Sequence, residues 1–182
     1  MRKHGWMRWC PDEVVSSVTE IDPNRLKQQG VQAVLLDLDN TLVPWQRVEV
    51  PEEVRCWIES MKAAGLRLCL VSNTRRKRRL EVLAKRLDID YVPRAFKPRR
   101  YGLRQALERL RATPEQAVMI GDQIFTDVWG GNRMAMRTIL VAPLARHEFI
   151  GTRVSRLLER ILLWVYRRAG LLKRGTGTGE TY

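Results

Sequence analysis

Two aspartates, Asp37 and Asp39, stand at the end of an apolar run that has the length of a buried strand. Side chains two residues apart on a strand point the same way, so both carboxylates could face one site. Buried like charges are costly unless a positive charge neutralises them. A hard divalent cation with oxygen ligands best explains such a pair. A turn with Asn40 and Thr41 is the plainer alternative, and an EF-hand loop is excluded because Leu42 stands where its glycine is required.

More polar residues follow later strand-like runs in the same way: Ser72, Lys97, Asp122 and Asp127. Taken singly, each has an ordinary explanation. Ser72 or Asp127 could cap a helix, and Lys97 could be a solvated loop lysine. Their common position after apolar runs is what makes them candidates for one site.

The elements that must position these residues alternate along the chain. The apolar runs predict strands at 31–38, 66–72, 90–95, 117–122 and 138–143, and the helical spacings predict helices at 51–65, 74–87, 99–112 and 125–136. This alternation predicts a three-layer α/β/α Rossmann-like fold with a parallel sheet. Ligands of such sheets bind beyond the carboxyl ends of the strands, so the polar residues above should converge there.

The order of these motifs, D-x-D-x-T, a strand-terminal Ser, a Lys and then G-D-x(4)-D, resembles the haloacid dehalogenase (HAD) superfamily of phosphohydrolases, class IIIA. The resemblance implies that Asp37 is the nucleophile that forms an aspartyl-phosphate and that Asp39 is the general acid and base. It also implies Mg²⁺, held by the side chains of Asp37 and Asp122 and by the backbone carbonyl of Asp39. An Asp at position 39 favours a phosphatase over the ATPase and mutase relatives.

The same resemblance assigns the residues around this centre. Ser72, Asn73 and Lys97 would bind the phosphoryl oxygens, and Lys97 would also offset the repulsion between the carboxylates. Thr41 and Asp127 would lie around the metal, with Asp127 either near the ion or orienting Lys97.

Within the superfamily, the chain resembles the YqeG branch over residues 11 to about 170. The stretches that carry this likeness are PDEVVSSVTEID, LLDLDNTLVPW, FKPRRYG and GDQIFTDVWGGNRMAMRTILVAPL. Members of the branch include phosphatidylglycerophosphatases, which implies a phosphate-ester substrate that is an anionic phospholipid. No segment between the motifs is long enough for a cap domain, so the site should be open to a large substrate. A soluble nucleotide or sugar phosphate is therefore less favoured.

Charge agrees with an anionic partner. Lys and Arg number 33 against 20 Asp and Glu, which gives a formal net charge of +13. Such a charge favours phosphate esters, nucleic acid or an anionic membrane surface. Four arginines follow strand ends and are expected to form an electropositive rim, the alternative being a solvated helix face: Arg75, Arg76, Arg99 and Arg100. A nucleic-acid partner, or an RNA-associated role, is less favoured because no binding module is recognisable.

The C-terminal region predicts a basic amphipathic helix at 150–172 that includes Trp164. Such a helix suits a membrane surface, or it packs on the domain, and the sequence favours neither. We therefore expect a HAD-like core with an N-terminal helical extension at 1–149, this helix, and a flexible Gly/Thr-rich tail at 173–182.

The start of the chain lacks the apolar stretch of a secretory signal, and no apolar segment is long enough to span a bilayer. We expect a cytoplasmic protein, bound peripherally to the inner face of the membrane. Cys56 and Cys69 lie in apolar segments, which favours small buried side chains in a reducing compartment. The sequence carries no indication of the oligomeric state.

Overall fold

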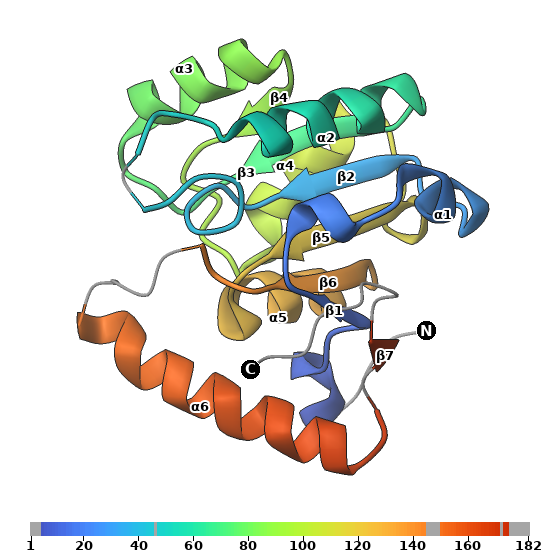
Figure 1. The fold of residues 1–182 in the computed structure, drawn as a ribbon, viewed down its shortest axis with the longest axis vertical. Helices are drawn as coiled ribbons and strands as arrows, with labels where there is room; N and C mark the ends of the chain where they lie inside the picture. The colour runs from blue at the N-terminus through green and yellow to red at the C-terminus, as the bar shows by residue number, and fades with distance from the viewer. Residues whose placement is uncertain (1–4, 46, 145–149, 172, 175–182) are drawn as a thin grey trace.

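The strands of this computed structural model form one parallel sheet in the part of the chain that the structure describes, residues 5–45, 47–144, 150–171 and 173–174. The sheet order is β4-β3-β2-β5-β6-β1-β7, and every pairing is parallel (Figure 1). The strands are β1 Glu13–Val15, β2 Ala33–Leu36, β3 Arg67–Val71, β4 Asp90–Val92, β5 Ala117–Gly121, β6 Arg137–Val141 and β7 Lys173–Arg174. β2 is buried along its whole length, as its continuous apolar sequence requires.

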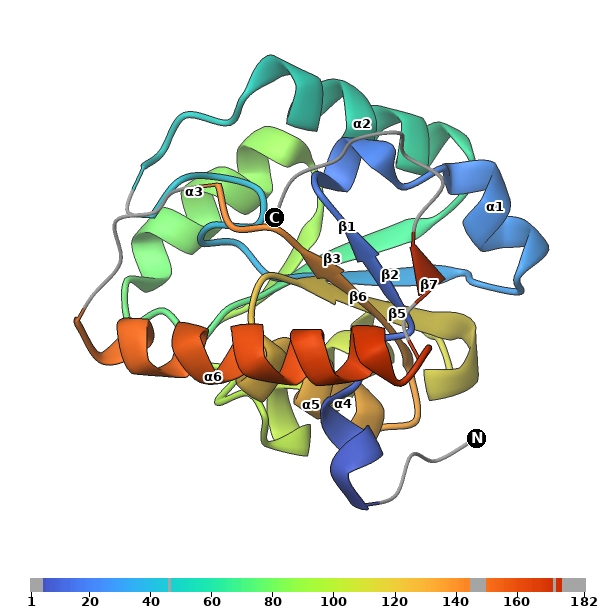
Figure 2. The same cartoon turned by 60° about the horizontal axis from the view of Figure 1, so that its bottom comes forward.

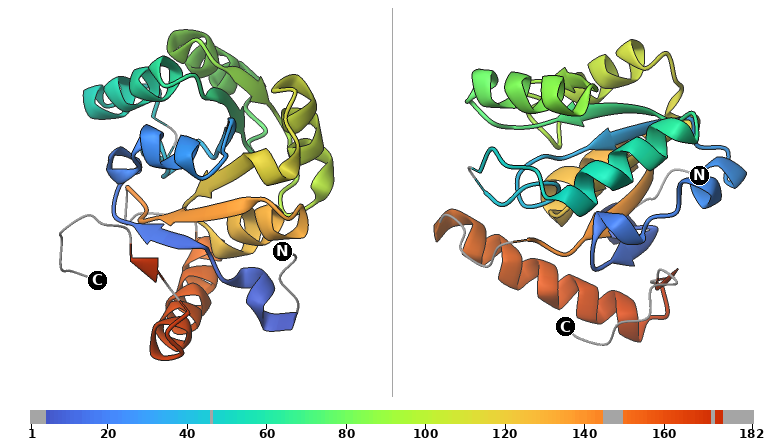
Figure 3. Two further views of the ribbon diagram at one scale, coloured as in Figure 1. Left: turned by 90° about the vertical axis from the view of Figure 1, so that its right-hand side faces the viewer. Right: turned by 45° about the horizontal axis from the view of Figure 1, so that its top comes forward.

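Helices cover both faces of this sheet. They are α1 Pro23–Gln28, α2 Glu52–Ala63, α3 Lys77–Leu87, α4 Arg100–Arg109, α5 Trp129–Arg133 and α6 Ile150–Arg168, with 3-10 turns η1 Gly5–Trp9, η2 Val18–Glu20 and η3 Pro114–Gln116 and a π-helical turn η4 Ile124–Val128. α2 and α3 lie on one face, and α4 and α5 on the other (Figures 1 and 3). This confirms the three-layer α/β/α fold predicted from the alternation of strands and helices.

Alternate side chains of β2 enter two separate cores. Val34 and Leu36 pack with the apolar side chains of α2 and α3, whereas Leu35 packs with Leu103 and Leu107 of α4. Each strand residue therefore has an apolar partner on one face, and the sheet is held firmly between its layers.

The N-terminal region differs in part from the expected helical extension. It holds η1, η2 and α1, but it also contributes β1, which pairs in parallel with β6 and was not predicted. Three residues are too few to show a strand periodicity in the sequence. The expected flexible tail also begins differently, because Lys173–Arg174 forms β7 beside β1; residues 175–182 lie outside the described residues.

α6 lies along the domain and packs on it through one face (Figure 2). Glu159 and Tyr166 are buried, and Leu162 and Leu163 pack against the cluster of Ile124, Val128 and Leu140. The Tyr166 hydroxyl donates to the carbonyl of Trp6 at 2.7 Å, and their rings stack. Among the described side chains of α6, four apolar ones are exposed on the opposite face: Leu158, Ile161, Trp164 and Val165. None of the described helices has the length and apolar composition that crossing a bilayer requires.

The prediction that Cys56 is buried is wrong. Cys69 is buried in β3, but Cys56 lies on the exposed face of α2. Val54, Trp57, Ile58 and Met61 form the buried face of that helix, and residue 56 falls between them on the opposite side.

α4 closely approaches the connection that carries Lys97. A Cβ atom at Gly102 would lie 2.4 Å from the Cα atom of Ala95, two residues before that lysine. The glycine therefore allows the helix and the connection to touch, although its backbone conformation needs no glycine.

Replacing Gly102 with alanine should destabilise the protein by about 1–3 kcal/mol, the usual range for overpacking, even though alanine is the better helix former. Urea unfolding measures the change in the free energy of unfolding. The control is Arg104→Ala, an exposed position of the same helix, which should stay within about 0.5 kcal/mol of the parent protein. Equal effects of the two substitutions would contradict the close contact.

Candidate active site

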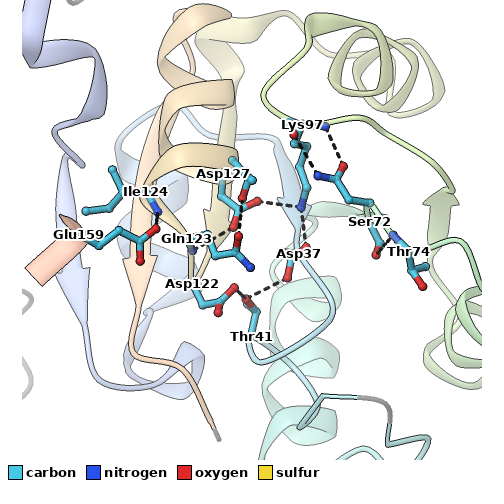
Figure 4. A network of polar contacts seen from close by, with 12 residues as sticks. Asp37, Thr41, Ser72, Thr74, Lys97, Asp122, Gln123, Ile124, Asp127 and Glu159 are labelled. Atoms are coloured by element: carbon cyan, nitrogen blue, oxygen red, sulfur yellow. Dashed lines mark hydrogen bonds and ion pairs between the residues drawn. The ribbon is translucent and has the colours of Figure 1, made fainter. Parts of the chain in front are cut away.

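Asp37 extends β2 by one residue at the carboxyl edge of the sheet. Its backbone N–H donates to the carbonyl of Ile120 in β5 at 2.9 Å, which fixes the direction of the side chain. Its Oδ1 atom lies 2.5 Å from Nζ of Lys97, and its Oδ2 atom accepts from the hydroxyl of Thr41 at 3.4 Å (Figure 4). Thr41 also donates to Asp122 Oδ1 at 3.4 Å, so it joins two of the expected metal ligands.

Lys97 is buried between two carboxylates. Its Nζ atom lies 2.5 Å from Asp37 Oδ1 and 2.8 Å from Asp127 Oδ1. Burial alone would lower the pKa of this amine, but Asp127 and Asp37 outweigh it and raise the pKa above its usual value. Asn73 holds the backbone of Lys97 from both sides, because its side chain accepts from Lys97 N at 2.7 Å and donates to Lys97 O at 3.0 Å. The site therefore has a fixed positive charge.

Three buried carboxylates lie close together at this position, and Lys97 pairs with two of them. One oxygen from each of Asp37, Asp122 and Asp127 lies within 4.8 Å of the other two. Burial raises the pKa of Asp127, Lys97 opposes this shift, and the charge of Asp37 adds to it. One ammonium group cannot balance three carboxylates, and a set of hard oxygen ligands suits a divalent cation such as Mg²⁺. The residues present therefore fit a metal site.

The motif G-D-x(4)-D has a steric explanation. A Cβ atom at Gly121 would lie 2.3 Å from the carboxylate of Asp127, so no larger residue leaves room for it. The π-helical turn η4 folds Asp127 back toward the strand, with its N–H donating to the carbonyl of Gln123 at 2.9 Å. Its Oδ2 atom in turn accepts from the N–H of Gln123 at 3.1 Å. Such turns are frequent at functional sites.

Asp39 faces a partner that the sequence analysis did not identify. Its Oδ1 atom lies 2.8 Å from Nη1 of Arg79, a nearly buried side chain at the start of α3. Arg79 also donates to the carbonyl of Arg47 through Nε at 2.9 Å and Nη2 at 2.6 Å. The carboxylate of Asp39 is thus held by Arg79 and is not one of the three that make up the acidic cluster. The only sequence signal for Arg79 is its place in the run RRKRR.

A cavity of about 240 Å³ opens above these residues. Its lining includes Thr126 and five of the predicted polar residues: Asp37, Asp39, Ser72, Asn73 and Lys97. Ser72 is almost fully buried, and its hydroxyl accepts from the N–H of Thr74 at 3.1 Å, which leaves the hydroxyl proton for a second partner. Trp45 also lines the cavity and gives it one aromatic wall.

The four arginines expected to form a rim are exposed near the carboxyl edge of the sheet. Arg75 and Arg76 lie between β3 and α3, and Arg99 and Arg100 lie at the start of α4. Both connections follow strands whose carboxyl ends face the site. An anion that approaches the cavity therefore passes exposed positive charges.

Glu159 of α6 supports the connection between Asp122 and Asp127. Its Oε1 atom accepts from the N–H of Ile124 at 2.8 Å, and the residue is buried (Figure 4). The backbone N–H at the start of η4 therefore has its hydrogen-bond acceptor in a residue 35 positions later in the chain. Nothing in the local pattern around Glu159 predicts this contact.

Comparisons with known proteins agree with this geometry. The model of the haloacid dehalogenase-like hydrolase family matches residues 4–134. The protein named Probable phosphatase YqeG from Bacillus subtilis (strain 168) is 38% identical over 162 residues, which are 89% of this chain and 94% of that protein. The Arabidopsis thaliana protein named Phosphatidylglycerophosphate phosphatase 1, chloroplastic/mitochondrial is 32% identical over 171 residues, which are 88% of this chain but only 49% of that protein.

A solved structure shows the same fold. The crystal structure of an uncharacterized protein from Listeria monocytogenes serotype 4b superposes with a TM-score of 0.53 and 18% identity, and the match covers 73% of this chain and 98% of that one.

Removing the carboxylate of Glu159 should loosen the metal-binding connection. Because supports of this kind are typically worth 10–100-fold in activity, we expect Glu159→Ala to lower the hydrolysis of p-nitrophenyl phosphate by about that factor, and more metal to be needed for half-maximal rate. Glu159→Gln keeps an oxygen acceptor for Ile124 N–H and is the matched control, with the smaller loss. A similar loss in both variants would show that the hydrogen bond to Ile124 is not the reason.

Proposed function

This chain belongs to the haloacid dehalogenase-like hydrolase family and is a phosphoric monoester hydrolase, and we propose that it uses Mg²⁺ to release phosphate from phosphatidylglycerophosphate. The observation that carries the chemistry is the buried cluster of Asp37, Asp122 and Asp127 around the amine of Lys97. The choice of substrate is supported by the Arabidopsis relative, which matches 88% of this chain.

Asp37 is the nucleophile of the proposed reaction. One of its oxygens attacks the phosphorus atom, and the bond between phosphorus and the glycerol oxygen breaks as the bond to Asp37 forms. Asp39 gives its proton to the departing oxygen. In the second half, a water molecule gives a proton to Asp39 and attacks phosphorus, the bond to Asp37 breaks, and inorganic phosphate leaves.

The other residues position the phosphoryl group and balance its charge. Lys97 presents a fixed ammonium, and the hydroxyl of Ser72, whose oxygen accepts from the N–H of Thr74, can donate its proton to a phosphoryl oxygen at the cavity wall. Arg79 fixes the carboxylate of Asp39 near the cavity. Mg²⁺, held by Asp37, Asp122 and the Asp39 carbonyl, would supply the positive charge that lets a carboxylate approach a phosphate dianion.

Phosphate release from phosphatidylglycerophosphate in detergent micelles tests the proposal. The parent enzyme with Mg²⁺ should hydrolyse this lipid faster than glycerol phosphate, nucleotide and sugar phosphates or 5′-phosphorylated RNA. Asp37→Asn should reduce release to background because no nucleophile is left, and EDTA should do the same until Mg²⁺ is restored. Rapid hydrolysis of the soluble esters with no release from the lipid would overturn the substrate while leaving the class of enzyme intact.

The role of Asp39 predicts a dependence on the leaving group. An alkoxide needs a proton to depart, whereas p-nitrophenolate does not, so Asp39→Asn should slow turnover of an alkyl phosphate by about 10²–10⁴-fold. With p-nitrophenyl phosphate the first turnover should be much less affected. Because the second half also needs Asp39, rapid mixing should show a burst of nitrophenolate equal to the enzyme concentration. Equal losses on both esters in the first turnover would exclude Asp39 as the proton donor.

A further inference from the structure

Exposed apolar side chains gather around the entrance of the active site. Four of them belong to the connections that follow β2, β4 and β6 and a fifth to the first turn of α4, and we call them the apolar rim: Trp45, Val48, Phe96, Leu144 and Tyr101. Trp45 lines the cavity itself, and Phe96 directly precedes Lys97. The backbone N–H of Leu144 donates to the carbonyl of Asn40, another lining residue, at 3.0 Å. Trp45, Phe96 and Leu144 are therefore tied to the cavity or to residues that line it.

The protein holds these side chains outward. Phe96 is 55% exposed and has a φ of 53°, a left-handed conformation that is costly for an aromatic residue. The N–H of Trp45 donates to the side chain of Asn40 at 3.1 Å. The connection around Val48 is anchored to α3, because Arg86 donates to the carbonyl of Val48 at 3.0 Å and Arg79 donates to that of Arg47.

Positive charge accompanies the apolar rim. Arg75, Arg76, Arg99 and Arg100 are exposed in the connections that also carry or neighbour Phe96 and Tyr101. Aromatic side chains mixed with arginine are typical of proteins that sit at the headgroup level of a bilayer. Apolar burial and attraction to anionic lipid add together there, with roughly fivefold in affinity for each cation near the surface.

We propose that the apolar rim and these four arginines form a docking surface for an anionic lipid bilayer. The proposal rests on the proposed function, since it names the surface from which that substrate would enter. A cavity of about 240 Å³ accommodates the phosphate end of a lipid and leaves the acyl chains outside it. Docking through the rim places the cavity over the headgroups, so the phosphate reaches Asp37 while the lipid stays in the membrane.

The outer face of α6 is the competing surface. It exposes Leu158, Ile161, Trp164 and Val165, but α6 extends along the side of the domain, away from the sheet edge where it begins (Figures 1 and 2). Docking through α6 alone would not turn the cavity toward the lipid. Substitutions in the apolar rim and in α6 can therefore show which of the two surfaces binds the membrane.

The test is co-sedimentation with vesicles of phosphatidylcholine and phosphatidylglycerol, which contain no phosphate monoester and so report binding without catalysis. The rim variant is Val48→Ser/Phe96→Asn/Tyr101→Ser, in which asparagine tolerates the left-handed conformation at 96. We expect it to bind at least tenfold more weakly than the parent protein and to unfold at a similar temperature. Ile161→Ser/Trp164→Ser on α6, which removes exposed apolar side chains away from the rim, should bind like the parent.

A second arm tests the charges without touching the apolar side chains. Arg75→Gln/Arg99→Gln should weaken binding by about 25-fold, from about fivefold for each arginine, and pure phosphatidylcholine vesicles should bind the parent protein weakly. Loss of binding in the α6 variant but not in the rim variant would overturn the proposal. So would equal binding to neutral vesicles, or binding to RNA with none to vesicles.

The two proposals can fail separately. Vesicle binding through the rim without hydrolysis of phosphatidylglycerophosphate would refute only the substrate. Hydrolysis of that lipid in micelles by a protein whose rim variant still binds vesicles normally would refute only the docking surface.

Discussion

The ammonium group of Lys97 is the interaction on which the site depends. It lies 2.5 Å from Asp37 and 2.8 Å from Asp127 in a place that water barely reaches, and without it adjacent buried carboxylates would repel each other. Its pKa is raised above that of an ordinary lysine, so on the alkaline side its ion pairs stabilise the fold fully up to about pH 10.4 and are lost as pH rises through the higher folded value. On the acid side they are lost as the partner carboxylates become protonated. The charge is therefore permanent under physiological conditions.

The same cluster also raises the pKa of Asp127, chiefly because it is buried. The charge of Asp37 adds to this shift and Lys97 opposes it, and the cluster holds three carboxylates to one described ammonium group. A divalent cation beside Asp37 and Asp122 would offset this excess of negative charge and would also attract a phosphate dianion. One divalent cation would thus both balance the buried carboxylates of the protein and stabilise the negative charge of the substrate.

Much of this site could be predicted from the sequence because its residues follow the ends of buried strands. A parallel sheet brings such ends to one edge, so Asp37, Lys97 and Asp122 converge once the strands are recognised. Arg79 and Glu159 were missed, because each reaches the site from a helix through one contact across a long sequence separation. The exposure of Cys56 could have been predicted, since the helical spacing of Val54, Trp57, Ile58 and Met61 places it on the opposite face.

The missed contacts explain how a site without a cap domain keeps its shape. Arg79 ties Asp39 to α3 and to the connection after β2, while Glu159 holds the connection after β5 from the other side. α6 is in turn attached to the N-terminal turn η1 through Tyr166 and Trp6. α6 thus supports the catalytic connections from one side of the domain and does not cover the entrance of the cavity. A phosphatase built in this way can keep its catalytic groups in place and still present an open cavity to a substrate much larger than the cavity itself.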